Sequence, residues 1–388
     1  MRRGREIAIL FVAVIVGYVL AVVLAPGVVA PSPTPEPGER TVSDSPTTTS
    51  DRGSLPTTTT PQAEAYLVWS TGGLTSDLVD GLEERFDDLS VVRGDAVELD
   101  AEEGWVVPLD AVAIDPGSHG PFDREGSLAT LRPGGVALGE TSAAFRGLDV
   151  GDEMVIEGVN YEVAAITPDD VVGAAEVVFD QSDSTSPVVT DRYALISTDL
   201  ARTEFEDVVR AMYEGPAPLR IRSRGESPWL RHGDAVLPQI FIKTALGEFA
   251  YSNLSGSEFS QDPSFVEANI VTAEVPILGQ IQCHETVVDM LDGAMGQLVE
   301  EGLAHLVDPA GFAGCWNPRY IRPTTGRSSG ISRHAWGGAV DLNAASNPIG
   351  SAGTQDPRLV EVMLDWGFTW GGDWLVPDAM HFEYGIAP

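Results

Sequence analysis

Residues 332–341 read Ser-Arg-His-Ala-Trp-Gly-Gly-Ala-Val-Asp, and residues 378–383 read Asp-Ala-Met-His-Phe-Glu. Each segment contains one imidazole and at least one carboxylate close by in the chain. The chain has only 6 histidines, so their occurrence in two such patterned segments is informative. These two segments decide how the C-terminal part of the chain is interpreted.

Zinc binds imidazole nitrogen and carboxylate oxygen, and a catalytic zinc uses three protein ligands and keeps one position for water. His334, Asp341 and His381 supply such a set. The pair Gly337-Gly338 permits a tight turn and a close backbone approach between the first two ligands. We therefore predict a Zn²⁺ site formed by these three side chains.

Strand periodicity supports the same assignment, because alternate side chains of a strand point to opposite faces. Val340 and Leu342 can pack inward while Asp341 points to the metal. Phe382 shares a strand face with its apolar neighbours at 380 and 384, and His381 lies on the other face with Glu383. Glu383 is interpreted either as a group that orients a ligand or as a partner in a surface salt bridge.

Asp378 precedes His381 by three residues, which places a second carboxylate beside the metal. Such a group can take a proton from water and pass it to a leaving amine. A cation is also needed to hold an oxyanion or a substrate carboxylate, and Arg319 is our choice. Spacing alone does not exclude three competitors, Arg322, Arg327 and Arg333.

With Asn317-Pro318-Arg319, the two segments resemble the zinc D-alanyl-D-alanine carboxypeptidase and L-alanyl-D-glutamate endopeptidase family. The resemblance extends over about residues 240–384. It is closer to the endolysin-type branch, because VanY-like members carry Glu at the position of Asp378 and because Trp370-Gly371-Gly372 precedes it. It implies zinc bound by His334, Asp341 and His381, with Asp378 as general acid/base and Arg319 supporting the substrate. The family fold is a small α+β domain with an antiparallel sheet beneath the metal.

The N-terminal end predicts a membrane anchor. Residues 1–5 are basic and an apolar run follows at 7–24, which as a helix would span about 27 Å. Basic residues in front predict a cytoplasmic N-terminus and extracytoplasmic domains behind it. The alternative is a cleaved signal peptide and a secreted protein. Residues 31–62 are rich in Pro, Thr and Ser and predict a disordered linker.

An extracytoplasmic location fits the two cysteines, Cys283 and Cys315, which an oxidising compartment would allow to pair. The alternative is two buried thiols. The 58 acidic residues exceed the 23 basic ones, and the resulting formal net charge of −35 argues against nucleic acid as a partner.

Residues 63–224 predict a β-rich α+β domain without a catalytic cluster. Short apolar runs at 65–70, 90–99, 104–114, 135–138, 153–159, 161–166 and 193–196 predict strands, and residues 76–86 and 199–214 predict helices. His119 lies alone in a Gly/Pro-rich loop and is expected to be solvated. Residues 134–166 resemble the extracytoplasmic domains of FtsX/MacB-type permeases, which implies a recognition module.

Residues 237–388 predict the zinc peptidase domain. Residues 240–243 are expected to form strand or loop. An amphipathic helix is predicted at 286–302, with Val299 on its apolar side. A second helix is predicted at 357–366, capped by Asp356 and ended by Gly367, with a buried stripe of Leu359, Val360, Met363 and Leu364.

The sequence thus predicts a membrane-anchored zinc peptidase that cleaves peptidoglycan stem peptides, as an L-Ala-D-Glu endopeptidase or a D-Ala-D-Ala carboxypeptidase. The alternative is a wall-binding or complex-assembly protein, in which residues 63–224 contact a membrane-protein partner. Three tryptophans, Trp366, Trp370 and Trp374, are interpreted either as the wall of a substrate groove or as core.

Overall fold

The structure is a computed structural model that describes residues 64–226, 230, 237–253, 259–321 and 330–386. The predicted membrane span at 7–24 and the linker at 31–62 lie outside the described residues. Among the residues that are described, no helix is both long and apolar enough to cross a bilayer. The fold is α+β, as predicted, with one large sheet and a small antiparallel sheet near the C-terminus.

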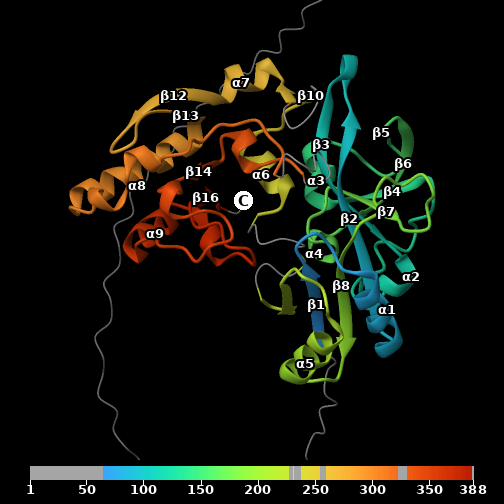
Figure 1. The fold of residues 1–388 in the computed structure, drawn as a ribbon. Coiled ribbons are helices and arrows are strands. Elements are labelled where there is room, and N and C mark those ends of the chain that lie inside the picture. Colours follow the sequence, from blue (N-terminus) through green and yellow to red (C-terminus); the bar gives the residue numbers. More distant parts are fainter. Residues whose placement is uncertain (1–63, 227–229, 231–236, 254–258, 322–329, 387–388) are drawn as a thin grey trace, which may run out of the picture. The chain divides into compact units, whose positions relative to one another are not determined.

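Eleven of the described strands form the large sheet, in the order β11-β10-β3-β7-β4-β6-β5-β2-β8-β1-β9 (Figure 1). Most pairs are antiparallel, whereas β3–β7 and β4–β6 are parallel. The strands are β1 (Glu64–Ser70), β2 (Leu89–Asp100), β3 (Val106–Ile114), β4 (Gly135–Gly139), β5 (Glu153–Ile156), β6 (Val159–Thr167), β7 (Val177–Asp180), β8 (Asp191–Thr198), β9 (Leu219–Ser223), β10 (Tyr251–Asn253) and β11 (Phe259–Gln261).

Every apolar run that predicted a strand between residues 65 and 196 contributes to this sheet. No strand was predicted at the positions of β7 and β9. The predicted boundaries at 63–224 and 237–388 stay predictions. Two strands that follow residue 237, β10 and β11, extend the large sheet at its β3 edge, where Tyr251 pairs with Val106. We call the described residues 64–226 the N-terminal half and residues 237–386 the C-terminal half.

Both helices predicted in the N-terminal half are confirmed as α1 (Ser76–Arg85) and α5 (Arg202–Met212). Leu82 and Val209 from these helices are fully buried in one core cluster with Tyr66 of β1, because each helix turns one apolar stripe to the sheet. Shorter helical segments are η1 (Glu102–Gly104), α2 (Pro116–His119), α3 (Glu140–Arg146) and α4 (Asp169–Val172).

His119 corrects one expectation, because its side chain is buried and not solvated. Its Nδ1 lies 3.0 Å from Ser90 Oγ and its Nε2 lies 3.1 Å from the Val171 carbonyl oxygen. Burial lowers the pKa of this imidazole, which both contacts can satisfy in its neutral form. The Gly/Pro-rich surroundings suggested an exposed loop, but α2 packs this residue against β2.

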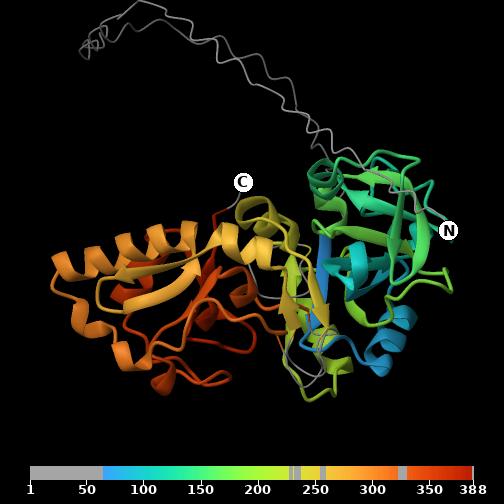
Figure 2. The ribbon, with the colours of Figure 1, turned by 90° about the horizontal axis from the view of Figure 1, so that it is seen from above.

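The C-terminal half places a hairpin and two long helices around a small sheet of order β14-β16-β15. Figure 2 shows α8 lying along the β12–β13 hairpin. The elements are α6 (Gln239–Leu246), α7 (Pro263–Asn269), β12 (Ile270–Val275), β13 (Gly279–His284), α8 (Glu285–Glu300), η2 (Ala304–Leu306), η3 (Pro309–Gly311), η5 (Arg333–Trp336), β14 (Ala339–Asp341), η6 (Ala344–Ser346), α9 (Pro357–Asp365), β15 (Phe368–Trp370), η7 (Gly371–Asp373) and β16 (His381–Tyr384).

The two helices predicted here are confirmed as α8 and α9, and the Asp356 side chain accepts a hydrogen bond from the Arg358 amide at 2.9 Å, as a cap should. Their apolar stripes need two corrections. Leu364 of α9 is 48 % exposed and does not belong to the buried stripe, whereas Val362, which was not predicted, is buried. Val299 of α8 is 51 % exposed, because it lies beyond the edge of the stripe that faces the core.

Residues 240–243 are also a correction, because they belong to the helix α6 and not to a strand. Short apolar runs fit a buried helix as well as a strand, so periodicity could not distinguish them. Ile242 and Leu246, four residues apart, lie on one buried side of this helix.

Candidate metal centre

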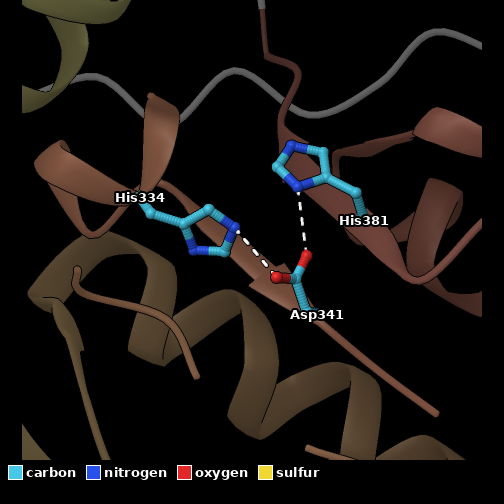
Figure 3. A group of neighbouring side chains, drawn as sticks. All are labelled: His334, Asp341 and His381. Carbon is cyan, nitrogen blue, oxygen red and sulfur yellow. Dashed lines mark hydrogen bonds and ion pairs between the residues drawn. The ribbon is translucent and has the colours of Figure 1, made fainter. Parts of the chain in front are cut away.

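Asp341 and His381 are brought together by the register of the small sheet. They are direct partners in the antiparallel pair β14–β16, so their side chains leave the same face at the same position. Val340 and Phe382 are fully buried on the other face, as the alternation predicted. Asp341 Oδ1 lies 3.1 Å from His381 Nδ1 (Figure 3).

His334 reaches the same carboxylate from η5, and its Nε2 lies 3.2 Å from Asp341 Oδ2. Gly337 ends η5 with a φ of +63°, and a Cβ at that position would come within 2.5 Å of the His284 amide nitrogen. The tight turn and the close approach predicted for the glycine pair are therefore both present. They return the chain to β14, so that Asp341 meets His334.

The environment of His334 fits a metal ligand. Its Nδ1 lies 2.7 Å from the Cys315 carbonyl oxygen, to which an N–H at this position donates. In that tautomer the neutral ring presents a lone pair at Nε2. Nε2 is buried, and no hydrogen-bond partner for it occurs in the part of the chain that is described. A cation between Nε2 and the Asp341 carboxylate would satisfy both groups.

His381 lies between two carboxylates, since its Nε2 is 3.2 Å from Glu383 Oε2. Burial alone would lower the pKa of His381, but the hydrogen bonds to Asp341 and Glu383 raise it to about 9. Burial alone would raise the pKa of Asp341, and the two imidazoles beside its carboxylate, His334 and His381, lower it below its usual range. Without metal, a protonated imidazole therefore takes the place of the cation.

One ligand atom from each of His334, Asp341 and His381 can be chosen so that all lie within 4.8 Å of one another, and all three residues are buried. Two nitrogens and one oxygen form a donor set that zinc accepts, and a catalytic zinc held by three protein ligands would keep a fourth position for water. Glu383 then fixes the orientation of His381 and leaves Nδ1 for the metal. This contact favours the first of the two interpretations of Glu383.

Asp378 lies at the turn that leads into β16. Its backbone amide donates to the Gly371 carbonyl at 2.8 Å, and its carbonyl accepts from the His381 amide at 3.0 Å. Its Oδ1 is buried and has no hydrogen-bond partner among the described residues. Burial raises the pKa of this carboxyl, while the charge of His381 opposes the rise. An unsatisfied carboxylate oxygen next to a metal site is suited to accept a proton.

The positive charge of Arg319 also opposes the rise in the pKa of Asp378. The Asn317 amide donates to the His334 carbonyl at 2.9 Å, and the Ser332 amide donates to the Arg319 carbonyl at 3.0 Å. These bonds hold the segment of Arg319 beside the segment of His334.

The structure weighs against one competitor of Arg319. Arg333 Nη2 donates to the Leu237 carbonyl at 3.0 Å, and its guanidinium carbon lies 5.9 Å from the centre of the Trp336 ring. Its charge is therefore committed to these groups. Arg322 and Arg327 lie outside the described residues.

The three tryptophans differ in position. The Trp374 ring centre lies 5.1 Å from that of His381, so this side chain borders the metal centre. Trp370 holds the segment that carries Asp378, since its Nε1 donates to the carbonyl of the next residue, Ala379, at 2.9 Å. Trp366 is exposed and donates to Gln297 of α8 at 2.8 Å. Of the three, Trp374 is the one whose ring contacts a candidate metal ligand.

Cys283 and Cys315 form the predicted disulfide, which joins the end of β13 to the loop before η5. The sequence did not indicate that the Cys315 carbonyl would orient His334. The sequence places Cys315 four residues before Arg319, which was the only indication that the disulfide lies near the site. A hydrogen bond to a backbone carbonyl does not depend on the type of residue, so the sequence could not predict it.

Residues 325–384 match a family model described as D-alanyl-D-alanine carboxypeptidase. The matched range includes His334, Asp341, Asp378 and His381, and Arg319 precedes it. Together with the His/Asp/His cluster, this match supports a zinc peptidase in the C-terminal half. No curated protein matches the chain.

Solved structures similar to the chain include three extracytoplasmic or permease domains. The periplasmic region of MacB from Actinobacillus actinomycetemcomitans has a TM-score of 0.29 and 10% identity, covering 41% of this chain and 87% of that one. A domain of a putative permease protein from Porphyromonas gingivalis has a TM-score of 0.28 and 10% identity, covering 44% and 92%. The extracellular domain of the noncanonic ABC-type transporter YknZ from Gram-positive bacteria has a TM-score of 0.28 and 9% identity, covering 37% and 88%. Likenesses of this size carry no conclusion, and the permease resemblance of residues 134–166 stays a prediction.

Proposed function

We propose that the protein is a zinc metallopeptidase that cleaves peptidoglycan stem peptides at the cell envelope. The observation that carries this proposal is the buried Nε2 of His334, which lies 3.2 Å from Asp341 Oδ2 and has no hydrogen-bond partner among the described residues, within a cluster that also includes His381. The nearby carboxylate of Asp378 favours hydrolysis over structural metal binding, because a structural zinc needs no base beside it.

The residues divide the chemistry among them. His334, Asp341 and His381 would hold the zinc ion, which when bound would supply a Lewis acid that polarises a carbonyl and lowers the pKa of a water molecule. Asp378 accepts a proton from the attacking water at Oδ1 and delivers it to the nitrogen of the leaving amine. Arg319 holds the negative charge that develops on the carbonyl oxygen, or a carboxylate of the substrate. Trp374 borders the peptide next to His381.

The scissile bond is either L-Ala-D-Glu, as in the endolysin-type branch, or the terminal D-Ala-D-Ala bond. We favour the endolysin-type branch, because Asp378 stands where VanY-like members carry Glu. In this proposal residues 7–24 anchor the chain in the bilayer, and residues 31–62 span part of the wall. The N-terminal half is then free to contact a membrane-protein partner.

The deciding experiment is a digest of purified muropeptides by the full-length protein, with and without a chelator, analysed by mass spectrometry. Endopeptidase action splits the stem, whereas carboxypeptidase action removes one alanine. We expect one zinc per chain and loss of cleavage on chelation. Asp378→Asn should lower kcat by at least about 100-fold. Asp365→Asn, a change at an exposed carboxylate of α9, is the matched control.

Two results would contradict this function. The first is a full-length protein without stoichiometric zinc. The second is a zinc-loaded protein that binds muropeptides without any turnover. That second result would instead support the non-catalytic wall-binding alternative.

A further inference from the structure

Four charged side chains meet where the two halves of the chain touch, and we call them the Glu176 cluster. Arg146 and Glu176 come from the N-terminal half, and Lys243 and Glu248 come from the C-terminal half. Arg146 Nη2 lies 2.6 Å from Glu176 Oε2 and 2.7 Å from Glu248 Oε1. Lys243 Nζ lies 2.8 Å from each of the same two oxygens. Two cations thus balance two carboxylates.

The Glu176 carboxylate holds one face of α6. Its Oε2 accepts from Lys243, and its Oε1 accepts from Gln239 Nε2 at 2.8 Å. Gln239 and Lys243 are four residues apart, so both extend from the same side of the helix. The Glu176 and Lys243 side chains are fully buried, which makes the loss of either partner costly. A carboxylate of the N-terminal half therefore holds α6, together with the Pro108 carbonyl, which accepts from Gln239 Nε2 at 3.0 Å and from Lys243 Nζ.

The C-terminal end of α6 contacts the segment that carries His334. The Trp336 indole nitrogen donates to the Gly247 carbonyl at 3.1 Å, and His284 Nε2 donates to the Leu246 carbonyl at 3.1 Å. Trp336 is the last residue of η5 and stands two positions after His334. A Cβ at Gly338 would come within 2.9 Å of Leu246 Cδ1, so the chain leaving η5 is also pressed against α6. A displacement of α6 must therefore move η5 or open a gap beside it.

The segment on the other side of the metal centre also rests on the N-terminal half. Leu375 packs against the core cluster that contains Leu67 and Tyr193. Arg220 Nη2 donates to the Asp373 carbonyl at 3.4 Å. Trp374, between these two contacts, borders His381. The N-terminal half thus supports both segments that flank the candidate site.

We propose that Glu176 is a positioning residue for the metal centre, acting through α6 and η5 on His334. In this arrangement the N-terminal half helps to set the geometry of the metal ligands, in addition to any role as a recognition module. The expected effect of Glu176 on catalysis rests on the proposed function. Its expected effect on the geometry of the metal ligands can be measured without any substrate turnover.

The test compares Glu176→Gln with the wild type in the full-length protein. We expect zinc affinity to fall by about tenfold or more, the lower end of the effect of disturbing groups that orient metal ligands. The visible absorption spectrum of the Co²⁺-substituted protein should change, because it reports the geometry of the ligands. With a muropeptide substrate, kcat should fall more than KM rises.

Asp95→Asn is the matched control. Asp95 is also a buried carboxylate of the N-terminal half, and it accepts from the Val189 and Thr190 amides at 2.8 and 2.9 Å. It forms no hydrogen bond or ion pair with α6 among the described residues. If both variants lower the Tm equally and both keep the wild-type zinc affinity and Co²⁺ spectrum, Glu176 is merely structural and the proposal is wrong.

Glu176→Gln leaves Lys243 and Arg146 with one carboxylate and can prevent folding. In that case the double variant Glu176→Gln, Lys243→Met removes one charge of each sign and is measured in its place. A wild-type metal spectrum in that folded double variant overturns the proposal. A wild type that binds zinc but cleaves no stem peptide overturns only the proposed function, while a wild type that binds no metal overturns both.

Discussion

Asp341 and His381 face each other as direct partners across β14 and β16, with Oδ1 and Nδ1 3.1 Å apart. The same imidazole reaches Glu383 on its other side at 3.2 Å. Metal binding at Nδ1 must therefore displace the Nδ1 proton of an imidazolium ring that lies between two carboxylates.

Zinc binding should release close to one proton per site at pH 7, because the pKa of His381 in the metal-free protein is raised to about 9. Competition from this proton weakens as the pH rises, so the apparent affinity should increase between pH 6 and pH 8. Calorimetry in buffers of different ionisation enthalpy measures the release. An affinity that stays constant over this range would contradict the prediction.

Stability of the metal-free protein should depend on pH in the same window. The folded pKa of His381 is raised above its unfolded value of about 6.5. Its contribution to the free energy of unfolding is therefore complete below about pH 6.5 and is lost as the pH rises towards 9. We expect the Tm of the metal-free protein to fall over this range. The zinc-loaded protein, in which the proton is absent, should lack this decline.

Replacement of Glu383 by Leu should weaken zinc binding by roughly 10- to 100-fold, because it removes the group that orients His381. It should also lower the pKa of His381 in the metal-free protein, which NMR titration of the ring can follow. Glu361→Leu, at an exposed position of α9, is the control and should leave both quantities unchanged.

Loss of the disulfide should affect both stability and metal binding. Cys283→Ala with Cys315→Ala should cost about 3–4 kcal/mol of unfolding free energy by the chain-entropy model. Because the Cys315 carbonyl accepts from His334 Nδ1 at 2.7 Å, zinc affinity should fall as well. Denaturant unfolding and zinc titration of the folded variant measure the two effects separately. Unchanged affinity would show that the carbonyl is held in place without the bridge.

Gly337→Ala should destabilise the protein by about 1–3 kcal/mol or more, because φ is +63° there and the new Cβ would meet the His284 amide at 2.5 Å. The matched control is Gly296→Ala within α8, where a Cβ has nothing within 4 Å. That change should stabilise the helix by up to about 1 kcal/mol. Thermal unfolding of the two variants should therefore shift the Tm in opposite directions.

The ligand set followed from residue chemistry, because few side chains bind zinc and strand alternation assigned Asp341 and His381 to polar faces. The register that makes these two residues direct partners did not follow, because pairing between distant strands has no local signal. The prediction that His119 is solvated was wrong. Nearby glycine and proline suggested an exposed loop, whereas α2 buries the side chain against Ser90.

Residues 240–243 were assigned to the wrong element for a related reason. An apolar run of this length is compatible with helix or strand, and the choice depends on what packs against it. Here the partner is Glu176, which lies 67 residues before Lys243 in the chain. In the sequence, neither residue of such a distant buried ion pair can be distinguished from an ordinary charged residue at the surface.

The Cys315 carbonyl has one further implication, which concerns the timing of activation. In a reducing compartment the thiols of Cys283 and Cys315 stay unlinked, and the backbone that orients His334 lacks its covalent constraint. Oxidation supplies this constraint and with it a better-ordered site for zinc. If the proposed function and export hold, a newly made chain would gain its full metal affinity only after reaching an oxidising compartment, and hydrolysis would be kept away from the site of synthesis.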